Sequence, residues 1–131
     1  MRQSAVRCRR GQAAVELALV LPVLLLLLFA TVEAGRLFAA HLTVVAASRE
    51  GARWATLGCN DGEIEARVRQ AAGPLDDPLL RVSVDPPWPR YTEGITVTVR
   101  VSYPVTVLMP VVNRILPDPV WVTGETRMRL G

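Results

Sequence analysis

Residues 17–32, LALVLPVLLLLLFATV, are the longest uncharged stretch of the chain and decide its fold. As a helix, these 16 residues would cover about 24 Å at 1.5 Å per residue. That is a little less than the roughly 30 Å hydrocarbon core of a bilayer. Counting from Ala13 lengthens the segment to 20 residues but places Glu16 inside it. We therefore predict a transmembrane helix over residues 12–34.

The residues before this stretch are basic, and we define residues 1–11 as a basic leader. The first ten residues hold four arginines and no acid: Arg2, Arg7, Arg9 and Arg10. Because basic residues mark the cytoplasmic end of a transmembrane helix, we expect the N-terminus in the cytoplasm. Residues 35–131 would then form an extracytoplasmic domain. The predicted location is the cytoplasmic (inner) membrane, crossed once.

The formal net charge of +3 comes from this leader. Without its four arginines the chain keeps 11 basic residues against 12 acidic ones. A nucleic-acid-binding protein needs basic residues clustered on a folded surface. We therefore expect no nucleic-acid partner.

Three interpretations of the apolar stretch are open. A secretory signal peptide has the same basic start and apolar centre, and Val32-Glu33-Ala34 would supply its cleavage site. An uncut signal anchor would only tether the chain, and either case describes a secreted or membrane-anchored extracytoplasmic binding domain. Neither accounts for Glu16, because an unpartnered carboxylate at the edge of a bilayer costs about 1–3 kcal/mol. The third interpretation is a helix used in assembly.

Spacing supplies a partner for Glu16. A cut after Gly11 would make Gln12 the new N-terminus, remove the leader arginines and leave Glu16 in fifth position. The new α-amine is a cation at the membrane surface and needs an anion. Glu16 of a neighbouring copy would supply that anion if the two helices were staggered by about one turn.

Two segments resemble a known family. Arg9-Arg10-Gly11, followed by AAVELALVLP at residues 13–22, is similar to the start of the TadE-like proteins. These are minor pilins, or pseudopilins, of the tight-adherence branch of the type IV pilus machinery. AASREGARWA at residues 46–55 is similar to the second recurring segment of that family. The resemblance covers about the first 57 residues.

The resemblance implies a function and a set of partners. A prepilin peptidase would cut between Gly11 and Gln12, and Glu16 would be the acid used in assembly. Leu17 stands where the family commonly has an aromatic residue. The partners would be the prepilin peptidase, other pilin or pseudopilin subunits, the inner-membrane assembly platform and the lipid bilayer, and the chain would reach a cell-surface pilus used in adhesion. The implied fold is pilin-like, with a long N-terminal helix packed on a small antiparallel sheet.

The helix is expected to continue beyond the membrane over residues 35–57, which contain no Pro and are rich in Ala, Leu and Arg. Small and apolar residues fall on one side of this extension, and Arg49, Glu50 and Arg53 fall on the other. Gly51 lowers the helix propensity, so we expect a bend or a loosening there. Gly58 is expected to cap the helix.

Residues 58–131 are predicted to be α+β. Asp61 is expected to cap a short helix that runs to about Ala72, where Gly73-Pro74 stops it. Alternation of apolar and polar residues predicts three strands. They lie at residues 80–84, 95–103 and 120–130.

We expect these strands to form an antiparallel sheet whose apolar face is covered by the two helices. Gly124 is expected to interrupt or bulge the third strand. Residues 104–117 are apolar but too short for a second span. We expect a loop packed on the core there, and a membrane-touching or partner-binding loop is the alternative. Residues 86–89, PPWP, are predicted to be a stiff turn rather than a recognition segment.

The sequence contains no recognisable catalytic site. His41 has no Cys or acid at ligand spacing, Asp76 and Asp77 are expected to be solvated, and Cys59 is expected to be a buried or inert thiol. Phosphate-binding loops, metal motifs and nucleophile elbows are not found. We therefore predict a protein that is not an enzyme and uses no metal or cofactor.

Overall fold

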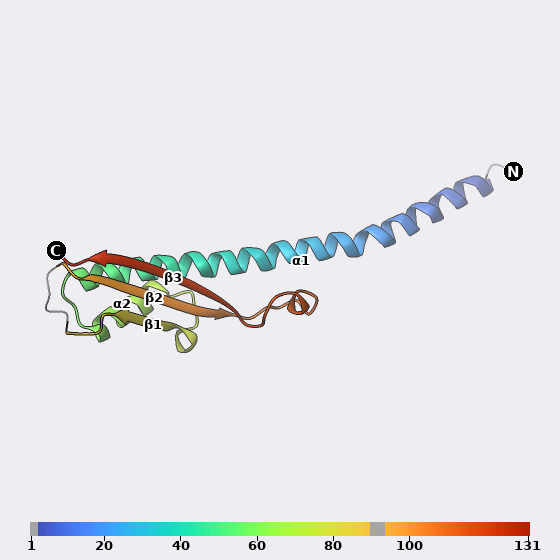
Figure 1. The fold of residues 1–131 in the computed structure, drawn as a ribbon. Helices are drawn as coiled ribbons and strands as arrows, with labels where there is room; N and C mark the ends of the chain where they lie inside the picture. Colours follow the sequence, from blue (N-terminus) through green and yellow to red (C-terminus); the bar gives the residue numbers. More distant parts are fainter. Residues whose placement is uncertain (1–2, 90–93) are drawn as a thin grey trace.

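A computed structural model describes residues 3–89 and 94–131, with side chains from Gly11 onward. The first two residues of the predicted leader lie outside this range. The elements are two helices, α1 (Gln3–Thr56) and α2 (Asp61–Ala71), and three strands, β1 (Arg81–Asp85), β2 (Thr96–Val105) and β3 (Val120–Arg129) (Figure 1). Two 3-10 turns, η1 (Asp77–Leu79) and η2 (Val112–Arg114), lie in the connections. The predicted α+β class is confirmed.

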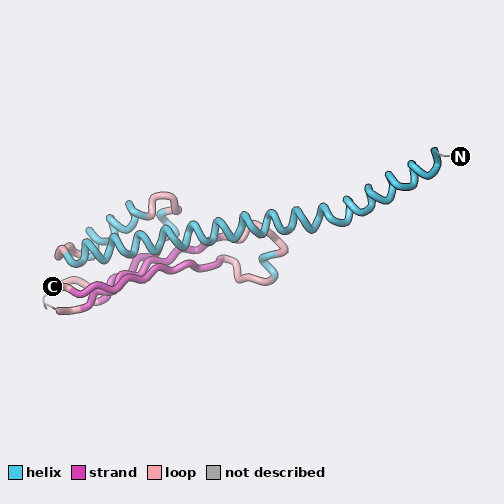
Figure 2. Tube along the Cα trace, turned by 90° about the horizontal axis from the view of Figure 1, so that it is seen from above, coloured by secondary structure: helices cyan, strands magenta, loops and turns pink. Residues whose placement is uncertain are grey.

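Helix α1 is unbroken over 54 residues. At 1.5 Å per residue it is about 80 Å long. Its C-terminal half lies along the sheet, and its N-terminal half extends away from the domain (Figures 1 and 2). The prediction that the apolar helix continues over residues 35–57 is confirmed as far as Thr56.

Gly58 ends α1 as predicted. Its φ of +84° lies in the left-handed region that glycine adopts without strain. The N–H of Gly58 donates to the Ala55 carbonyl at 3.1 Å, and the N–H of Cys59 donates to the Trp54 carbonyl at 3.4 Å. This pair of bonds is a Schellman motif, which satisfies carbonyls that the end of a helix otherwise leaves without partners.

The N-cap of α2 is Asn60, so the prediction of Asp61 was wrong by one residue. The Asn60 side chain accepts a hydrogen bond from the N–H of Glu63 at 2.9 Å, and the Glu63 carboxylate accepts one from the N–H of Asn60 at 3.0 Å. Together they form a capping box. Asp61 is the first helical residue, and its carboxylate accepts a hydrogen bond from the N–H of Trp88 at 2.9 Å.

The sheet has the order β1-β2-β3 and is antiparallel throughout. Pairing between β2 and β3 is continuous from Thr96 opposite Arg129 to Val105 opposite Val120, and Gly124 lies opposite Val101. The predicted interruption or bulge at Gly124 was therefore wrong.

The reason for glycine at this position is a close approach of α1. A Cβ on Gly124 would lie 2.5 Å from the carbonyl oxygen of Val44. Real Cβ atoms essentially never approach backbone atoms so closely, so β3 can lie against the backbone of α1 at this point only without a side chain.

One face of the sheet packs against both helices, as predicted. Helix α1 lies over β2 and β3, and α2 packs against α1 and touches β1. The alternating residues Val97, Val99 and Val101 of β2 are fully buried. The helices contribute mainly small residues to the same core: Ala40, Val44, Ala47, Ala52 and Ala55 from α1, and Ile64 and Val68 from α2.

Gly51 also serves packing, and α1 continues through it to Thr56. A Cβ there would lie 2.6 Å from a methyl group of Val68 on α2 and 2.9 Å from a methyl group of Val99 on β2. Gly51 is thus the point where α1, α2 and the sheet meet. The bend expected at Gly51 was inferred from the low helix propensity of glycine alone. The contact with α2 and the sheet could not be seen from the local sequence.

The opposite face of the sheet is polar. Glu125 pairs with Arg100 at 2.6 Å and with Arg127 at 2.8 Å. The hydrogen bond from Arg100, and then that from Arg127, lowers the pKa of the Glu125 carboxyl. The guanidinium of Arg81 lies 4.3 Å from the centre of the Trp121 ring. These contacts leave a charged, water-facing surface on the sheet.

Replacing Gly124 by Ala is expected to destabilise the domain more than replacing Gly51 by Ala. The added Cβ at Gly124 meets the backbone of Val44, whereas the one at Gly51 meets the ends of the Val68 and Val99 side chains. Overpacking of a core costs about 1–3 kcal/mol, and a backbone contact belongs at the upper end of that range. Thermal unfolding of the full chain in detergent, followed by near-ultraviolet circular dichroism, measures the difference.

Gly35→Ala is the matched control, because a Cβ there meets nothing within 4 Å. Alanine has the higher helix propensity, so this variant should unfold at the wild-type temperature or slightly above it. Equal unfolding temperatures for Gly124→Ala and Gly35→Ala would contradict the close contact between α1 and β3.

Candidate functional site

The N-terminal half of α1 presents apolar side chains to its surroundings on every side. Of the helices in the described residues, α1 is the one long and apolar enough to cross a membrane, and none of its most apolar window is buried in the domain. The exposed large side chains are Val15, Leu17, Leu19, Val20, Leu21, Val23, Leu24, Leu25, Leu26, Leu27, Leu28, Phe29 and Val32. A helix that is apolar all round requires an apolar environment.

Pro22 lies inside this part of α1. It lacks an N–H, so the helical bond to the carbonyl four residues earlier is missing. Figure 1 shows α1 curving over its N-terminal half, and proline is a common cause of such bending.

Gly11 and Gln12 lie on one turn of α1 and Glu16 on the next. They belong to the N-terminal half of the helix, which extends away from the sheet (Figure 1). All three are exposed, and a Cβ on Gly11 would meet nothing within 4 Å. Gln12 and Glu16 are four residues apart and so share one face of the helix. Within the part of the chain whose side chains are described, no hydrogen bond or ion pair engages Glu16. Arg36, the next basic residue, lies about 30 Å along α1. The structure thus brings no partner to Glu16 from its own domain.

Glu33 is a functional candidate that the sequence analysis did not single out. It is only 4% exposed. Its carboxylate accepts hydrogen bonds from Arg36 Nη1 at 3.1 and 3.3 Å and from the N–H of Leu108 at 3.4 Å. Arg36 Nη1 also lies 3.5 Å from the Thr106 carbonyl oxygen, to which it donates. These bonds fasten the β2–β3 loop, residues 106–119, to α1 just beyond the apolar stretch.

The second recurring segment, residues 46–55, is explained by packing. Ala47, Ser48, Gly51, Ala52 and Ala55 are all buried against the sheet and α2. Ser48 Oγ donates a hydrogen bond to the Val45 carbonyl at 2.8 Å. It also lies 2.8 Å from Thr126 Oγ1 on β3, and either hydroxyl can be the donor in that bond. Small residues at these positions let α1 approach its neighbours closely.

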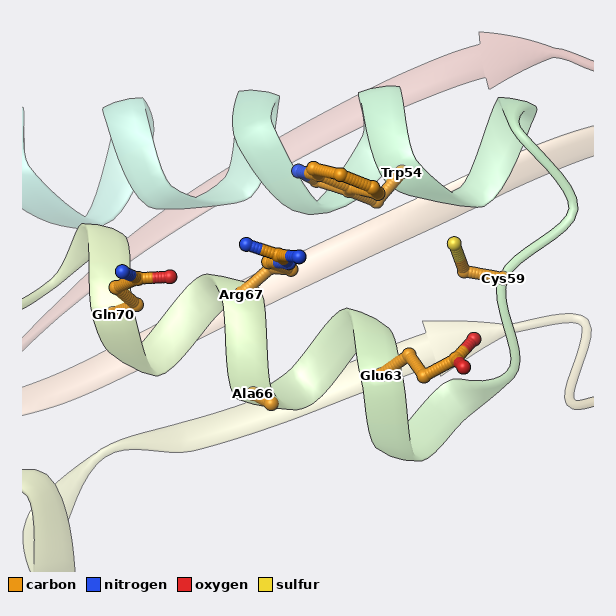
Figure 3. A pocket seen from close by; sticks show the side chains of 6 residues that line it. All are labelled: Trp54, Cys59, Glu63, Ala66, Arg67 and Gln70. Carbon is orange, nitrogen blue, oxygen red and sulfur yellow. The ribbon is translucent and has the colours of Figure 1, made fainter.

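The polar side of α1 faces α2 across a groove of about 370 Å³ (Figure 3). The Arg67 guanidinium lies 4.2 Å from the centre of the Trp54 ring, and Trp54 Nε1 donates to Glu50 at 2.7 Å. Glu50 is therefore half-buried, unlike Arg49 and Arg53, which are exposed as predicted. These contacts tie α1 to α2.

Cys59, predicted to be a buried or inert thiol, also lines this groove and is half-buried, packed against the core. His41 is exposed on α1. In the described ranges, no group of three His, Cys, Asp or Glu residues is placed to hold a metal ion.

Asp77 is largely exposed, as expected, but it is also ion-paired. Arg69 lies 2.8 Å from Asp77 and 2.6 Å from Glu65. The hydrogen bond to Asp77, and then that to Glu65, raises the pKa of Arg69. Exposed pairs of this kind contribute little to stability.

The fold and the exposed apolar helix together define a membrane-anchored protein with a small α+β domain on its helix. Residues 11–53 match a family model described as TadE-like protein. The match begins at Gly11, includes Glu16 and reaches most of the segment at residues 46–55, so the resemblance inferred from these residues is confirmed. No curated protein and no solved structure matches the chain.

The match covers both halves of α1 and leaves α2 and the sheet outside it. The TadE-like family is pilus-associated and is not a family of enzymes. Over residues 11–53 the chain is therefore similar to a family of pilus-associated proteins.

Replacing Glu33 by Ala should release the β2–β3 loop from α1. The change removes the ion pair with Arg36 and the acceptor of the Leu108 N–H, which are the contacts that hold the loop on α1. Arg114 in the loop is a built-in trypsin site. We expect trypsin to cut after Arg114 several-fold faster in Glu33→Ala than in the wild-type chain in detergent.

Glu65→Ala serves as the control, because Glu65 pairs with Arg69 at the surface and its side chain is 46% exposed. Cutting at Arg114 should keep its wild-type rate in that variant. An unchanged rate in Glu33→Ala as well would show that Glu33 does not hold the loop.

Proposed function

We propose that the chain is a minor pilin or pseudopilin of a tight-adherence, type IV-like pilus. It is held in the cytoplasmic membrane by the apolar half of α1 and assembles with other pilin subunits through that helix. The observation that carries the proposal is the TadE-like match, which coincides with one continuous helix. That helix has an exposed apolar half and a half buried under the sheet.

Retention of the apolar helix is supported by the contacts that α1 makes with the domain directly after the apolar stretch. Glu33 bonds to Leu108, and Ala40, Val44 and Ala47 belong to the core. A cut after Ala34, as in a secreted protein, would remove Glu33 and leave its loop contact unmade. A pilin-like chain keeps this helix from Gln12 onward and retains the contact.

Processing between Gly11 and Gln12 by a prepilin peptidase fits the surroundings of that bond. Gly11 is exposed, and no side chain of the domain lies near it. Hydrolysis of this bond would release the basic leader and create an α-amine on Gln12. The remaining helix would then begin almost directly with the apolar stretch.

The mature protein is expected to begin at Gln12. Mass spectrometry of the chain purified from native membranes reads this terminus directly. Gly11→Leu should leave the full-length chain in the membrane, because a bulky side chain is placed where the peptidase requires a small one. Gly35→Leu is the control and should be processed normally. A start at Met1 despite an active peptidase contradicts processing, and a start at Gly35 would instead support a secreted binding domain.

Glu16 is the residue that we assign to assembly. Its carboxylate lies one turn from the proposed amine, on an exposed face of α1. Once the leader arginines are removed, the next cation on its own helix is Arg36, about 30 Å away. An acid in apolar surroundings either stays protonated or finds a cation. The amine of Gln12 on a neighbouring subunit is the nearest cation that assembly would bring, and the pair would fix the axial stagger of the two helices.

Glu16→Gln keeps the size of the side chain and removes its charge. Membrane insertion and the fold of the domain should be unchanged, because Glu16 lies outside the domain. Incorporation into crosslinked or sheared pilus fractions should fall about tenfold or more, as expected for the loss of an ion pair worth more than 1.4 kcal/mol in a low-dielectric site. Glu16→Ala should behave in the same way.

Glu65→Gln is a matched control, since it removes a carboxylate from the surface of α2 and should leave incorporation intact. If both Glu16 variants are incorporated at wild-type levels, Glu16 is a tolerated residue at the membrane edge and the pairing with the amine is wrong.

A further inference from the structure

We propose that the β2–β3 loop, residues 106–119, inserts its apolar side chains into the bilayer leaflet that faces the domain. The loop would thereby form a second membrane contact beside α1. The proposal depends on α1 lying in a membrane and is independent of pilus assembly.

The loop exposes large apolar side chains to an unusual degree. Ile115 is 81% exposed, Leu108 67%, Val111 51% and Leu116 37%. Packing on the core, which the sequence predicted for residues 104–117, holds for Val105 and Val107, which are buried, but not for these four residues. Clustered apolar exposure of this kind marks an interaction surface rather than an ordinary loop.

The position of the loop identifies its partner. The loop extends from the end of the sheet along α1 toward the N-terminal half of the helix (Figures 1 and 2). Leu108 and Met109 line an apolar groove of about 430 Å³ together with Phe29 and Val32 of α1. Phe29 and Val32 end the apolar stretch, so when α1 spans a bilayer the loop lies at the depth of the last apolar turn. Its exposed surface is continuous with the lipid-facing surface of the helix.

The backbone of the loop is suited to a poorly hydrated site. Irregular backbone at membrane depth requires hydrogen-bond partners within the protein. The N–H groups of Val107 and Leu108 donate to the side chains of Asp118 and Glu33. Further N–H groups bond within the loop itself: Asn113 to Met109, Arg114 to Val111, and Ile115 and Leu116 to Val112. Pro110, Pro117 and Pro119 have no N–H to satisfy.

The two arginines of this region lie where a membrane surface would place them, and the exposed Asp118 accepts hydrogen bonds from the N–H of Val107 and from Asn113 within the loop. Arg36 is 39% exposed beside its partner Glu33, and Arg114 is exposed on the loop. Long arginine side chains at the end of a membrane segment can extend to lipid phosphates. The loop therefore combines an apolar tip with a basic residue, the arrangement of a segment that lies in the interface.

Photo-crosslinking of the full chain tests this proposal. p-Benzoylphenylalanine is placed at position 115, or at position 57 as the control, and the protein is reconstituted into vesicles of phosphatidylcholine and phosphatidylglycerol. Leu57 is the control position, because it is a large apolar residue that is 65% exposed, against 81% for Ile115, and it lies at the far end of α1. Irradiation should add the mass of one phospholipid to the chain at position 115, several-fold more often than at position 57.

A second pair of variants tests whether the apolar tip drives the contact. With the crosslinker at position 108, Ile115→Asp should lower the lipid adduct several-fold, and Leu57→Asp should leave it unchanged. Equal yields of lipid adduct at positions 115 and 57 would show that the loop lies in water. Crosslinked dimers in place of lipid adducts would show that a second copy of the chain covers it. Either result overturns the proposal.

Discussion

The domain depends on the contact between α1 and the sheet, and small residues on both sides make that contact possible. Gly124 and Gly51 allow approaches that a single methyl group would block. The core they enclose contains few large side chains, with Ile64 and several valines the largest that are fully buried. A three-stranded sheet of this size has little apolar surface of its own to bury. Helix α1 is therefore an integral part of the core and cannot be regarded as a tether attached to a finished domain.

The same helix changes its environment at Glu33. On the N-terminal side of this residue the apolar side chains of α1 face outward. On the C-terminal side Ala40, Val44 and Ala47 are buried in the core, while Phe38 and Leu42 stay exposed. The ion pair with Arg36 and the bond to Leu108 lie at this change. A charged pair is costly within hydrocarbon, so it marks the boundary between the two environments and fixes the neighbouring loop at the same level.

Local patterns in the sequence predicted most of the fold. Alternation predicted three strands to within one or two residues, and Gly58 and the apolar stretch predicted the course of α1. The errors have a common cause. Gly51 and Gly124 were interpreted from backbone propensity, but both are required by neighbours distant in sequence. Asn60 and Asp61 are both good N-cap residues, and only geometry distinguishes them. Glu33 was passed over because its partner Leu108 is 75 residues away. For Gly11 and Glu16 the sequence signal is local, whereas the proposed partner belongs to another copy.

The length of α1 has a mechanical consequence. Because one helix is continuous from Gln3 to Thr56 and is packed against the sheet over its C-terminal half, its two ends move together along the helix axis. A shift of one turn at the membrane end, about 5.4 Å, displaces the whole domain by the same amount. The height at which each domain stands above the bilayer is therefore dictated by contacts made near the other end of a rod about 80 Å long.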